Sequence, residues 1–146
     1  MPLKAIIEDP NIPKILHNVK FDWKFLWHHF GVSISPIRDT MQASMIIDNG
    51  LAGFEKGRHS IAGVAERYLG VTLDKDEELR QNFTGSELTE RQISYVEQDV
   101  IIPLRLMDAF KVHMDDSHLS ILDLEGSCIP FTGQMELNEF LIDQDK

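Results

Sequence analysis

The chain has 146 residues, a length that suits one domain, and its single cysteine excludes an internal disulfide framework and a multi-cysteine zinc site. Its formal net charge is −10, from 14 Lys and Arg against 24 Asp and Glu, which argues against a broad, sequence-independent grip on nucleic acid. Residues 1–73 hold 8 basic and 7 acidic side chains (+1), and residues 74–146 hold 6 and 17 (−11), so the first half tolerates a polyanion better. No apolar run is long enough to span a bilayer and no leader is evident, so we expect a cytoplasmic protein with no membrane role.

The opening of the chain predicts a helix, a short strand and a longer helix. The first helix covers residues 2–8, the strand 13–17 and the longer helix 19–30, with Asn18 as its N-cap and Gly31 as its stop. Four apolar residues of the longer helix form one stripe that is predicted to face the core: Val19, Trp23, Leu26 and Phe30. Trp27 is also expected to be a core residue rather than a platform for stacking bases.

The middle of the chain predicts an extended segment followed by two capped helices. Residues 32–38 are expected to form an edge strand or a loop, because they contain Pro36. Asp39 or Thr40 caps a helix that runs to about residue 47, and Ser60 caps a second helix that Gly70 closes. Between these helices, the glycine-rich residues 49–58 predict a mobile loop.

Two long helices are predicted in the second half, after a charged and irregular segment over residues 74–88. A capping box over residues 89–92 opens the first of them. Its predicted buried stripe is Ile93, Val96, Val100, Leu104 and Met107. Pro103 lies inside this helix and predicts a kink, the alternative being a helix that ends near residue 102. The second long helix is expected from residue 117 toward 137, with a break near Gly126 or Pro130.

Two aspartates, each with a polar companion one turn earlier, form the strongest candidate for a functional site. Asn18 precedes Asp22 by four residues, and Tyr95 precedes Asp99 by the same spacing. Positions four apart share one face of a helix, so each pair can direct two polar groups at one point. Two carboxylates that converge from these distant segments could hold a divalent metal, with Tyr95 able to orient a water molecule on it. The alternative for a single aspartate such as Asp22 is a helix cap.

The remaining polar candidates favour structural roles. Asp39 could be a third carboxylate of the site, but a helix cap is the favoured interpretation. Asp123 and Glu125 have the D-x-E spacing, yet they lie in a helical, acidic stretch and are expected on a solvated face. The histidines show no helical metal-ligand spacing and are interpreted as non-ligands, with His59 in the glycine-rich loop as the first exception to test. Cys128 has no base nearby in sequence and is not expected to be a nucleophile.

Four segments, in order along the chain, resemble one known family. Residues 17–22 (HNVKFD) are similar to the second signature of the DEDD-type 3′–5′ exonucleases, and Tyr95–Asp99 is similar to their third signature in its tyrosine form. Residues 39–44 (DTMQAS) and 59–70 (HSIAGVAERYLG) resemble the linking segments of proofreading domains and of ribonuclease D. Residues 129–143 resemble the junction between the exonuclease and polymerase domains of a DNA polymerase I-like (family A) DNA polymerase, as used in DNA replication.

This resemblance implies a fold and a division of the chain. The fold is α/β and ribonuclease H-like, incomplete in its opening strands, and therefore predominantly helical with one or two short strands. Residues 1–116 would form the C-terminal part of a 3′–5′ exonuclease domain. Residues 117–146 would form the junction and the start of a polymerase-like domain.

The resemblance also implies a mechanism, in which a proofreading-type enzyme hydrolyses phosphodiester bonds at the 3′ end of single-stranded DNA with two Mg²⁺ or Mn²⁺ ions. By position, Asp99 would ligate the metal that activates water, and Tyr95 would orient that water. Asp22 would support the second metal, and Asn18 would help to position the terminal nucleotide or the Asp22 loop.

The first signature of the family, a D-x-E on an opening strand, is expected upstream of residue 1. Two aspartates alone are too few oxygen ligands for a metal pair, so we expect these 146 residues by themselves to have little or no exonuclease activity. The apolar faces of residues 19–30 and 93–107 are then expected to be exposed. They would seek a separately encoded N-terminal half, a second copy of the chain or a rearranged helical packing.

Two alternatives to a DNA exonuclease remain open on the sequence. One is a non-catalytic remnant that binds nucleic acid or docks a protein, and metal binding would separate it from the enzyme. The other is a ribonuclease D-like enzyme that processes RNA 3′ ends. The polymerase-like tail favours DNA over this second alternative.

Overall fold

A computed structural model describes residues 2–49, 56–73 and 88–139 of the chain. The expected loop over residues 49–58 and the expected irregular segment over 74–88 lie largely outside this part, as does the tail after residue 139. No helix within the described residues is long and apolar enough to cross a membrane. The described residues are mostly helical, with two short strands, as the sequence predicted.

The sheet is a parallel pair formed by β1 (Lys14–Leu16) and β2 (Ile37–Asp39), with α2 (Val19–Phe30) as the connection between them. Parallel strands need such a crossover, and their carboxyl ends meet at one edge of the sheet. The register pairs Leu16 with Asp39, so the segments that follow the two strands begin side by side at this edge of the sheet.

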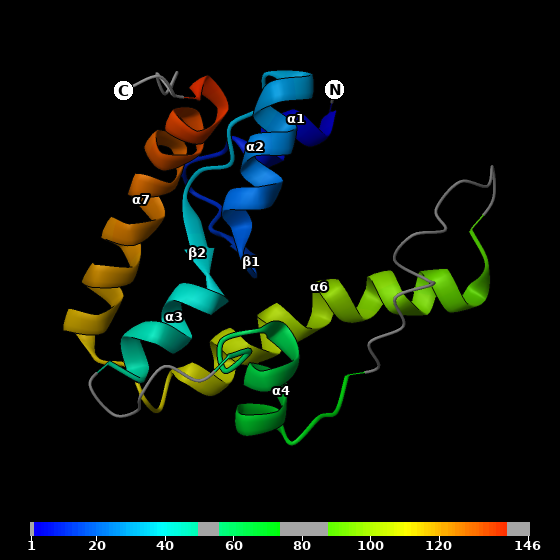
Figure 1. The fold of residues 1–146 in the computed structure, drawn as a ribbon, viewed down its shortest axis with the longest axis vertical. Coiled ribbons are helices and arrows are strands. Elements are labelled where there is room, and N and C mark those ends of the chain that lie inside the picture. Colours follow the sequence, from blue (N-terminus) through cyan, green and yellow to red (C-terminus); the bar gives the residue numbers. More distant parts are fainter. Residues whose placement is uncertain (1, 50–55, 74–87, 140–146) are drawn as a thin grey trace, which may run out of the picture.

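Within the described residues, five further helices accompany this unit (Figure 1). They are α1 (Pro2–Ile7), α3 (Thr40–Ile47), α4 (Ile61–Leu69), α6 (Glu90–Phe110) and α7 (Asp116–Asn138). The predicted caps of α4 and α6 and the predicted stop of α2 are confirmed: Ser60 accepts from the Gly63 N–H, Thr89 forms a capping box with Gln92, and Gly31 closes α2 in the left-handed region.

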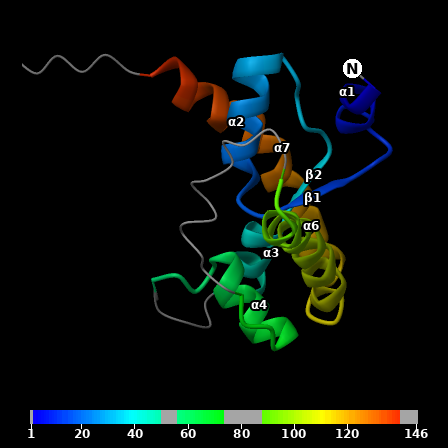
Figure 2. The same cartoon turned by 90° about the vertical axis from the view of Figure 1, so that its right-hand side faces the viewer.

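The core consists of two clusters. Figures 1 and 2 show α1 and α2 at one end of the molecule and α4 and α6 at the other, with the strands and α7 between them. The cluster at the α2 end contains Val19, Trp23, Ile34, Ile37 and Ile129. The cluster at the α6 end contains Ala43, Val64, Ala65, Ile102, Leu106, Met107, Phe110 and Leu122. Since α7 contributes Leu122 to one cluster and Ile129 to the other, this helix joins the two ends.

Helix α7 runs unbroken through Gly126 and Pro130, so the predicted break is wrong. Gly126 lies so close to the Ile37 carbonyl that a Cβ there would collide with it, and a Cβ on Gly133 would lie 2.6 Å from the Trp23 ring. Small residues at these points let α7 approach β2 and α2 closely, which offsets their low helix propensity. The described part of residues 117–146 therefore packs into the same core as the rest, and its assignment as a polymerase junction stays a prediction.

Of the five residues in the predicted stripe of α6, Met107 alone is buried, so the prediction is wrong for the other four. Ile93, Val96, Val100 and Leu104 are 41–60% exposed, and the buried apolar residues are Ile102, Pro103, Leu106, Met107 and Phe110. The helix continues through Pro103, which excludes an end near residue 102. Figure 1 shows the N-terminal half of α6 extending away from the other labelled helices. The exposure of these four residues agrees with the prediction that the apolar face of residues 93–107 is exposed.

The outer face of α2 is also apolar and exposed. Phe30, predicted to be buried, is 53% exposed, and Trp27, predicted to be core, is 39% exposed with its ring stacked on Trp23 at 5.6 Å between centroids. Val19 and Trp23 are buried and Leu26 packs against them, so three of the four stripe residues are confirmed. The stripe fails only at the last turn of the helix.

Candidate active site

The site begins where the two parallel strands end. Asp39 closes β2 and is 2% exposed. Its Oδ1 accepts hydrogen bonds from the N–H groups of Asn18 (2.9 Å) and Met41 (2.8 Å), and its Oδ2 accepts one from Val19 (2.9 Å). The predicted cap of α3 is confirmed by the bond from Met41, but the same carboxylate also holds the first residues of α2. Sequence reasoning missed this second role, which follows only from the register that places Asp39 beside Leu16.

Asn18 starts α2 in an unusual conformation. Its φ of 60° and ψ of 45° lie in the left-handed region, and its side chain makes no capping hydrogen bond to the helix. The prediction that Asn18 caps α2 with its side chain is therefore wrong, because the Asp39 carboxylate takes that place from outside the helix. The Asn18 side chain is exposed and free of a capping role, at the entrance to the turn that carries Asp22.

Asp22 lies in the first turn of α2 and is half-buried. Burial raises the pKa of its carboxyl group, a hydrogen bond to its own backbone lowers it, and the negative charges of Asp39 and Asp99 raise it further. The charge of Asp99 acts on Asp22 although 77 residues separate them in sequence. The structure thus brings the two predicted aspartates within electrostatic reach of each other.

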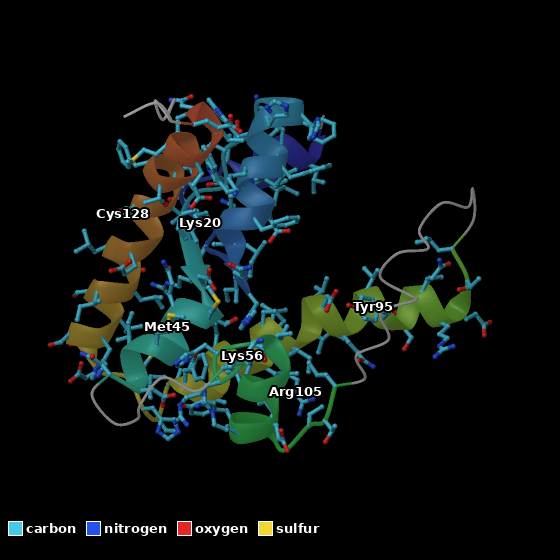
Figure 3. All side chains as sticks on the ribbon, in the orientation of Figure 1. Lys20, Met45, Lys56, Tyr95, Arg105 and Cys128 are labelled. Carbon is cyan, nitrogen blue, oxygen red and sulfur yellow. The ribbon has the colours of Figure 1, made fainter. Side chains whose placement is uncertain are left out.

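Asp99 and Tyr95 lie one turn apart on α6. By their spacing, both lie on the same face of the helix as the buried residues Ile102 and Leu106, nearer to its N-terminus. Tyr95 is half-buried and Asp99 is exposed, and Figure 3 marks Tyr95 on the half of α6 that extends from the core. Pro103 has no N–H to donate to the Asp99 carbonyl, as its position predicted.

The donor set fits part of a divalent-cation site. Asp22 and Asp99 could supply hard oxygen ligands, and a cation would offset both the burial and the acidic charges that raise the Asp22 pKa. Asp39 is a poor third ligand because backbone N–H groups occupy both of its oxygens. Among the described residues, no group of three or more His, Cys, Asp or Glu could hold a metal. The two aspartates therefore fit one side of a coordination sphere that needs further ligands.

Two half-buried histidines form hydrogen bonds beside the site. His17 Nδ1 lies 2.9 Å from Thr40 Oγ1, and the His17 ring also bonds to the backbone of His59. His59 Nδ1 lies 2.8 Å from Ser44 Oγ. Burial lowers the pKa of both rings, so they are neutral at pH 7 and serve as hydrogen-bonding groups. His59 thus bonds to Ser44 in this structure, and its interpretation as a non-ligand stays a prediction.

The D-x-E of α7 does not join the site. Asp123 and Glu125 are exposed, and Asp123 pairs with Arg38 at 3.2 Å. Neither contributes to the raised pKa of Asp22. The predicted solvated face is thus confirmed. Cys128 is likewise exposed on α7.

Sequence comparison assigns the family. The sequence model of the 3′–5′ exonuclease domain of family A DNA polymerases matches residues 1–115, and the chain belongs to this family of DEDD-type 3′–5′ exonucleases. Ribonuclease D of Escherichia coli is 38% identical over 100 residues, which cover 68% of this chain and 24% of the relative. DNA polymerase I of Rhizobium leguminosarum is 26% identical over 149 residues, which cover 97% of this chain and 14% of the relative. Relatives of both kinds occur, so the tail-based preference for DNA over RNA is not decided by these matches.

Solved structures confirm the fold. The structure titled the apo form of the nuclease has a TM-score of 0.81 at 23% identity and aligns with 100% of this chain and 70% of its own. E. coli ribonuclease D has a TM-score of 0.70 at 32% identity, over 92% of this chain and 34% of its own. Brucella melitensis NrnC with bound Mg²⁺ has a TM-score of 0.77 at 22% identity. The mostly helical chain with two described strands is thus a ribonuclease H-like exonuclease fold, as predicted.

The chain spans about a quarter of the length of E. coli ribonuclease D and about a seventh of that of DNA polymerase I. The activities of the complete relatives therefore belong to much longer chains. The match supports a nuclease of the hydrolase class, and the activity of these 146 residues is a separate question.

Proposed function

We propose that this chain provides part of the active site of a 3′–5′ exonuclease that hydrolyses phosphodiester bonds at nucleic-acid 3′ ends. The observation that carries the proposal is that the charge of Asp99 acts on Asp22, two acids from distant helices of a chain that belongs to an exonuclease family. Burial, and to a smaller extent the charges of Asp39 and Asp99, raise the pKa of Asp22, and carboxylates with a raised pKa are candidates for functional sites.

Each predicted residue has a role that its position supports. Asp22 and Asp99 would hold divalent cations, Mg²⁺ or Mn²⁺, and these would supply Lewis-acid activation of water and neutralise the charge on the phosphate. The Tyr95 hydroxyl, one turn before Asp99, would orient the attacking water. The Asn18 side chain, exposed and without a capping bond, would contact the terminal nucleotide.

The site needs acidic ligands from another segment. Two carboxylates are too few to hold two hard cations against their hydration, and Asp39 has no oxygen to spare. A further segment that carries a D-x-E would complete it. The exposed apolar faces of α2 and α6 support such a partner, since large exposed apolar faces mark interaction sites.

For the substrate we propose single-stranded DNA, on the polymerase-like tail at residues 129–143 and the DNA polymerase I relatives. RNA is the second candidate, supported by the 38% identity to ribonuclease D. In the first case the enzyme would act in proofreading, and in the second in RNA 3′ processing. Competing DNA and RNA oligonucleotides of one sequence, each with a 5′ label, would rank the two substrates.

Nucleotide release tests the proposal. We expect the purified chain with Mg²⁺ or Mn²⁺ to release few or no nucleotides, and the mixture with an N-terminal half that carries a D-x-E to release them from the 3′ end. Asp99→Ala should abolish the activity of the mixture, while Asp108→Asn, an exposed aspartate on the same helix, should leave it unchanged. A mixture that associates but stays inactive would contradict an exonuclease role, and robust activity of the chain alone would contradict an incomplete site.

A non-catalytic remnant that binds nucleic acid or docks a protein is the alternative. Calorimetric titration with Mn²⁺ separates the two functions, because a remnant needs no cation. Binding of Mn²⁺ that Asp22→Asn and Asp99→Asn both weaken supports the nuclease, whereas nucleic-acid binding that is indifferent to both substitutions and to Mn²⁺ favours the remnant.

A further inference from the structure

We propose that Asp39 is a positioning residue of this exonuclease site, which fixes the turn at Asn18 and thereby places Asp22 opposite Asp99. The inference rests on the proposed function only where it concerns metal binding. Its structural part stands on the hydrogen bonds that join the end of β2 to the start of α2.

The Asp39 carboxylate is committed to the backbone. It is 2% exposed and accepts three N–H groups at 2.8–2.9 Å, two of them from the segment that starts α2 and one from α3. A buried charge persists only when it is fully hydrogen-bonded, and charge-assisted bonds are the stronger kind. The residue therefore joins two helices that would otherwise begin independently at the ends of neighbouring strands.

The turn held by Asp39 is not self-supporting. Asn18 has a left-handed φ of 60° and gives α2 no side-chain cap, so the first N–H groups of the helix depend on an acceptor from elsewhere. Asp39 is that acceptor. Asp22 follows Val19 by three residues, less than one turn of helix, so a change at Val19 is transmitted to the Asp22 carboxylate with little damping.

A second link fixes the same segment. The Thr40 hydroxyl donates to the Leu16 carbonyl at 3.0 Å, and the His17 ring bonds to the Thr40 hydroxyl oxygen. Asp39 and Thr40 together thus fasten residues 16–19 to the end of β2 through side chains. This explains why an aspartate that caps α3 is buried, whereas Asp115, which caps α7 with His118 as its partner, is exposed.

The substitution Asp39→Asn tests the proposal in the full chain, with Asp115→Asn as the matched control. An amide oxygen at the Oδ1 position keeps the bonds from Asn18 and Met41, but the amide nitrogen cannot accept from Val19. If Asp39 acts only as the cap of α3, the two substitutions should have similar local effects. Asp39→Ala removes all three bonds and extends the series if that variant folds.

We expect the amide hydrogen of Val19, which loses its acceptor, to exchange roughly tenfold faster in Asp39→Asn, with no such change in Asp115→Asn. We expect Mn²⁺ affinity, followed by the paramagnetic signal of the free ion, to fall by roughly tenfold in Asp39→Asn only. Unchanged exchange at Val19 would overturn the proposal, as would faster exchange with Mn²⁺ affinity equal to that of a binding wild type. A wild-type chain that binds no Mn²⁺ would contradict the metal role of the proposed function, and the exchange measurement would still decide the role of Asp39.

Discussion

Two half-buried aspartates of this molecule have opposite surroundings. Asp48, at the end of α3, bonds to Arg58 at 2.9 Å and to Arg67 at 2.8 Å. Burial opposes ionisation of Asp48, but the two arginines outweigh it and hold its pKa below the ordinary value. Asp22, at the start of α2, is raised in pKa by burial and by the two aspartates near it. The pKa of one carboxyl group is thus held down by two arginines, and the pKa of the other is raised by burial and by its acidic neighbours.

The contrast separates a structural acid from an acid for which we propose a function. Asp48 holds the segment around Arg58 onto α4, and the Tyr68 hydroxyl donates a third, longer bond to it at 3.4 Å. Because the pKa of Asp22 is raised, ionisation of its carboxyl group decreases the stability of the fold. A fold retains such a group where another molecule is needed to complete it, and here a cation is the chemically suitable one.

The largest effect is expected at the structural acid. Asp48→Asn would leave Arg58 and Arg67 without their shared carboxylate in a partly buried position. We expect a loss of about 2 kcal/mol in the free energy of unfolding, measured by urea titration. Asp108→Asn, which breaks an exposed pair with Lys111, should cost less than about 0.5 kcal/mol. Equal costs for the two would contradict the structural role of Asp48.

The histidines behind the site should make stability depend on pH, with a smaller loss than Asp48→Asn. The pKa of His17 and of His59 is lowered by burial, so the unfolded chain takes up protons first as the pH falls. Stability is then full above about pH 6.5, the ordinary histidine pKa, and falls as the pH drops through the lowered folded values. Chemical unfolding between pH 5 and pH 8 checks this, and a His17→Gln, His59→Gln double variant should show a flatter profile. A profile unaltered by the double substitution would exclude these rings as its cause.

Both negatively and positively charged groups act on the pKa values of the His17 and His59 rings. Asp39 raises the pKa of His17 and the charge of His59 lowers it, while Asp48 raises the pKa of His59 and Arg67 and Arg58 lower it. Since burial is the largest cause in both, the direction of the pH effect does not depend on any single one of these neighbours.

The smallest effect is expected at Asp22, and its sign is the informative part. Because its folded pKa is raised, its contribution to stability is present below the unfolded pKa and lost as the pH rises through the folded value. Asp22→Asn should therefore stabilise the chain at pH 7, by no more than about 1 kcal/mol because the side chain is half-exposed to screening water. The gain should vanish in acid. A thermal unfolding series from pH 3 to pH 7 measures it, and destabilisation at pH 7 would show that Asp22 is a structural acid like Asp48.

Local features of the sequence predicted the local features of the fold. The ends of α2, α3 and α4 fell where a glycine stop or a Ser or Asp cap placed them, because a cap acts within one turn of its own helix. The family could also be predicted, because each of its two signatures lies within one short segment, residues 17–22 and residues 95–99.

Features that depend on distant packing could not be predicted in the same way. Ile93 and Val100 are predicted to be core residues by their helical spacing, yet which face of α6 is buried depends on the elements that pack against it, and both residues are exposed. The second role of Asp39 depends on the strand register, which pairs two three-residue strands across an intervening helix. Neither the buried face of α6 nor the second role of Asp39 can be predicted from a short segment of the chain.

The central claim is that Asp22 and Asp99 share one site, and the pKa of Asp22 measures it most directly. Carboxyl carbon NMR of the metal-free chain should show this pKa above the ordinary aspartate value. In Asp99→Asn it should move down toward that value, and in Asp123→Asn, which removes the same charge from α7, it should stay where it is. An Asp22 pKa that is ordinary in the wild type, or that ignores the loss of Asp99, would contradict a shared site.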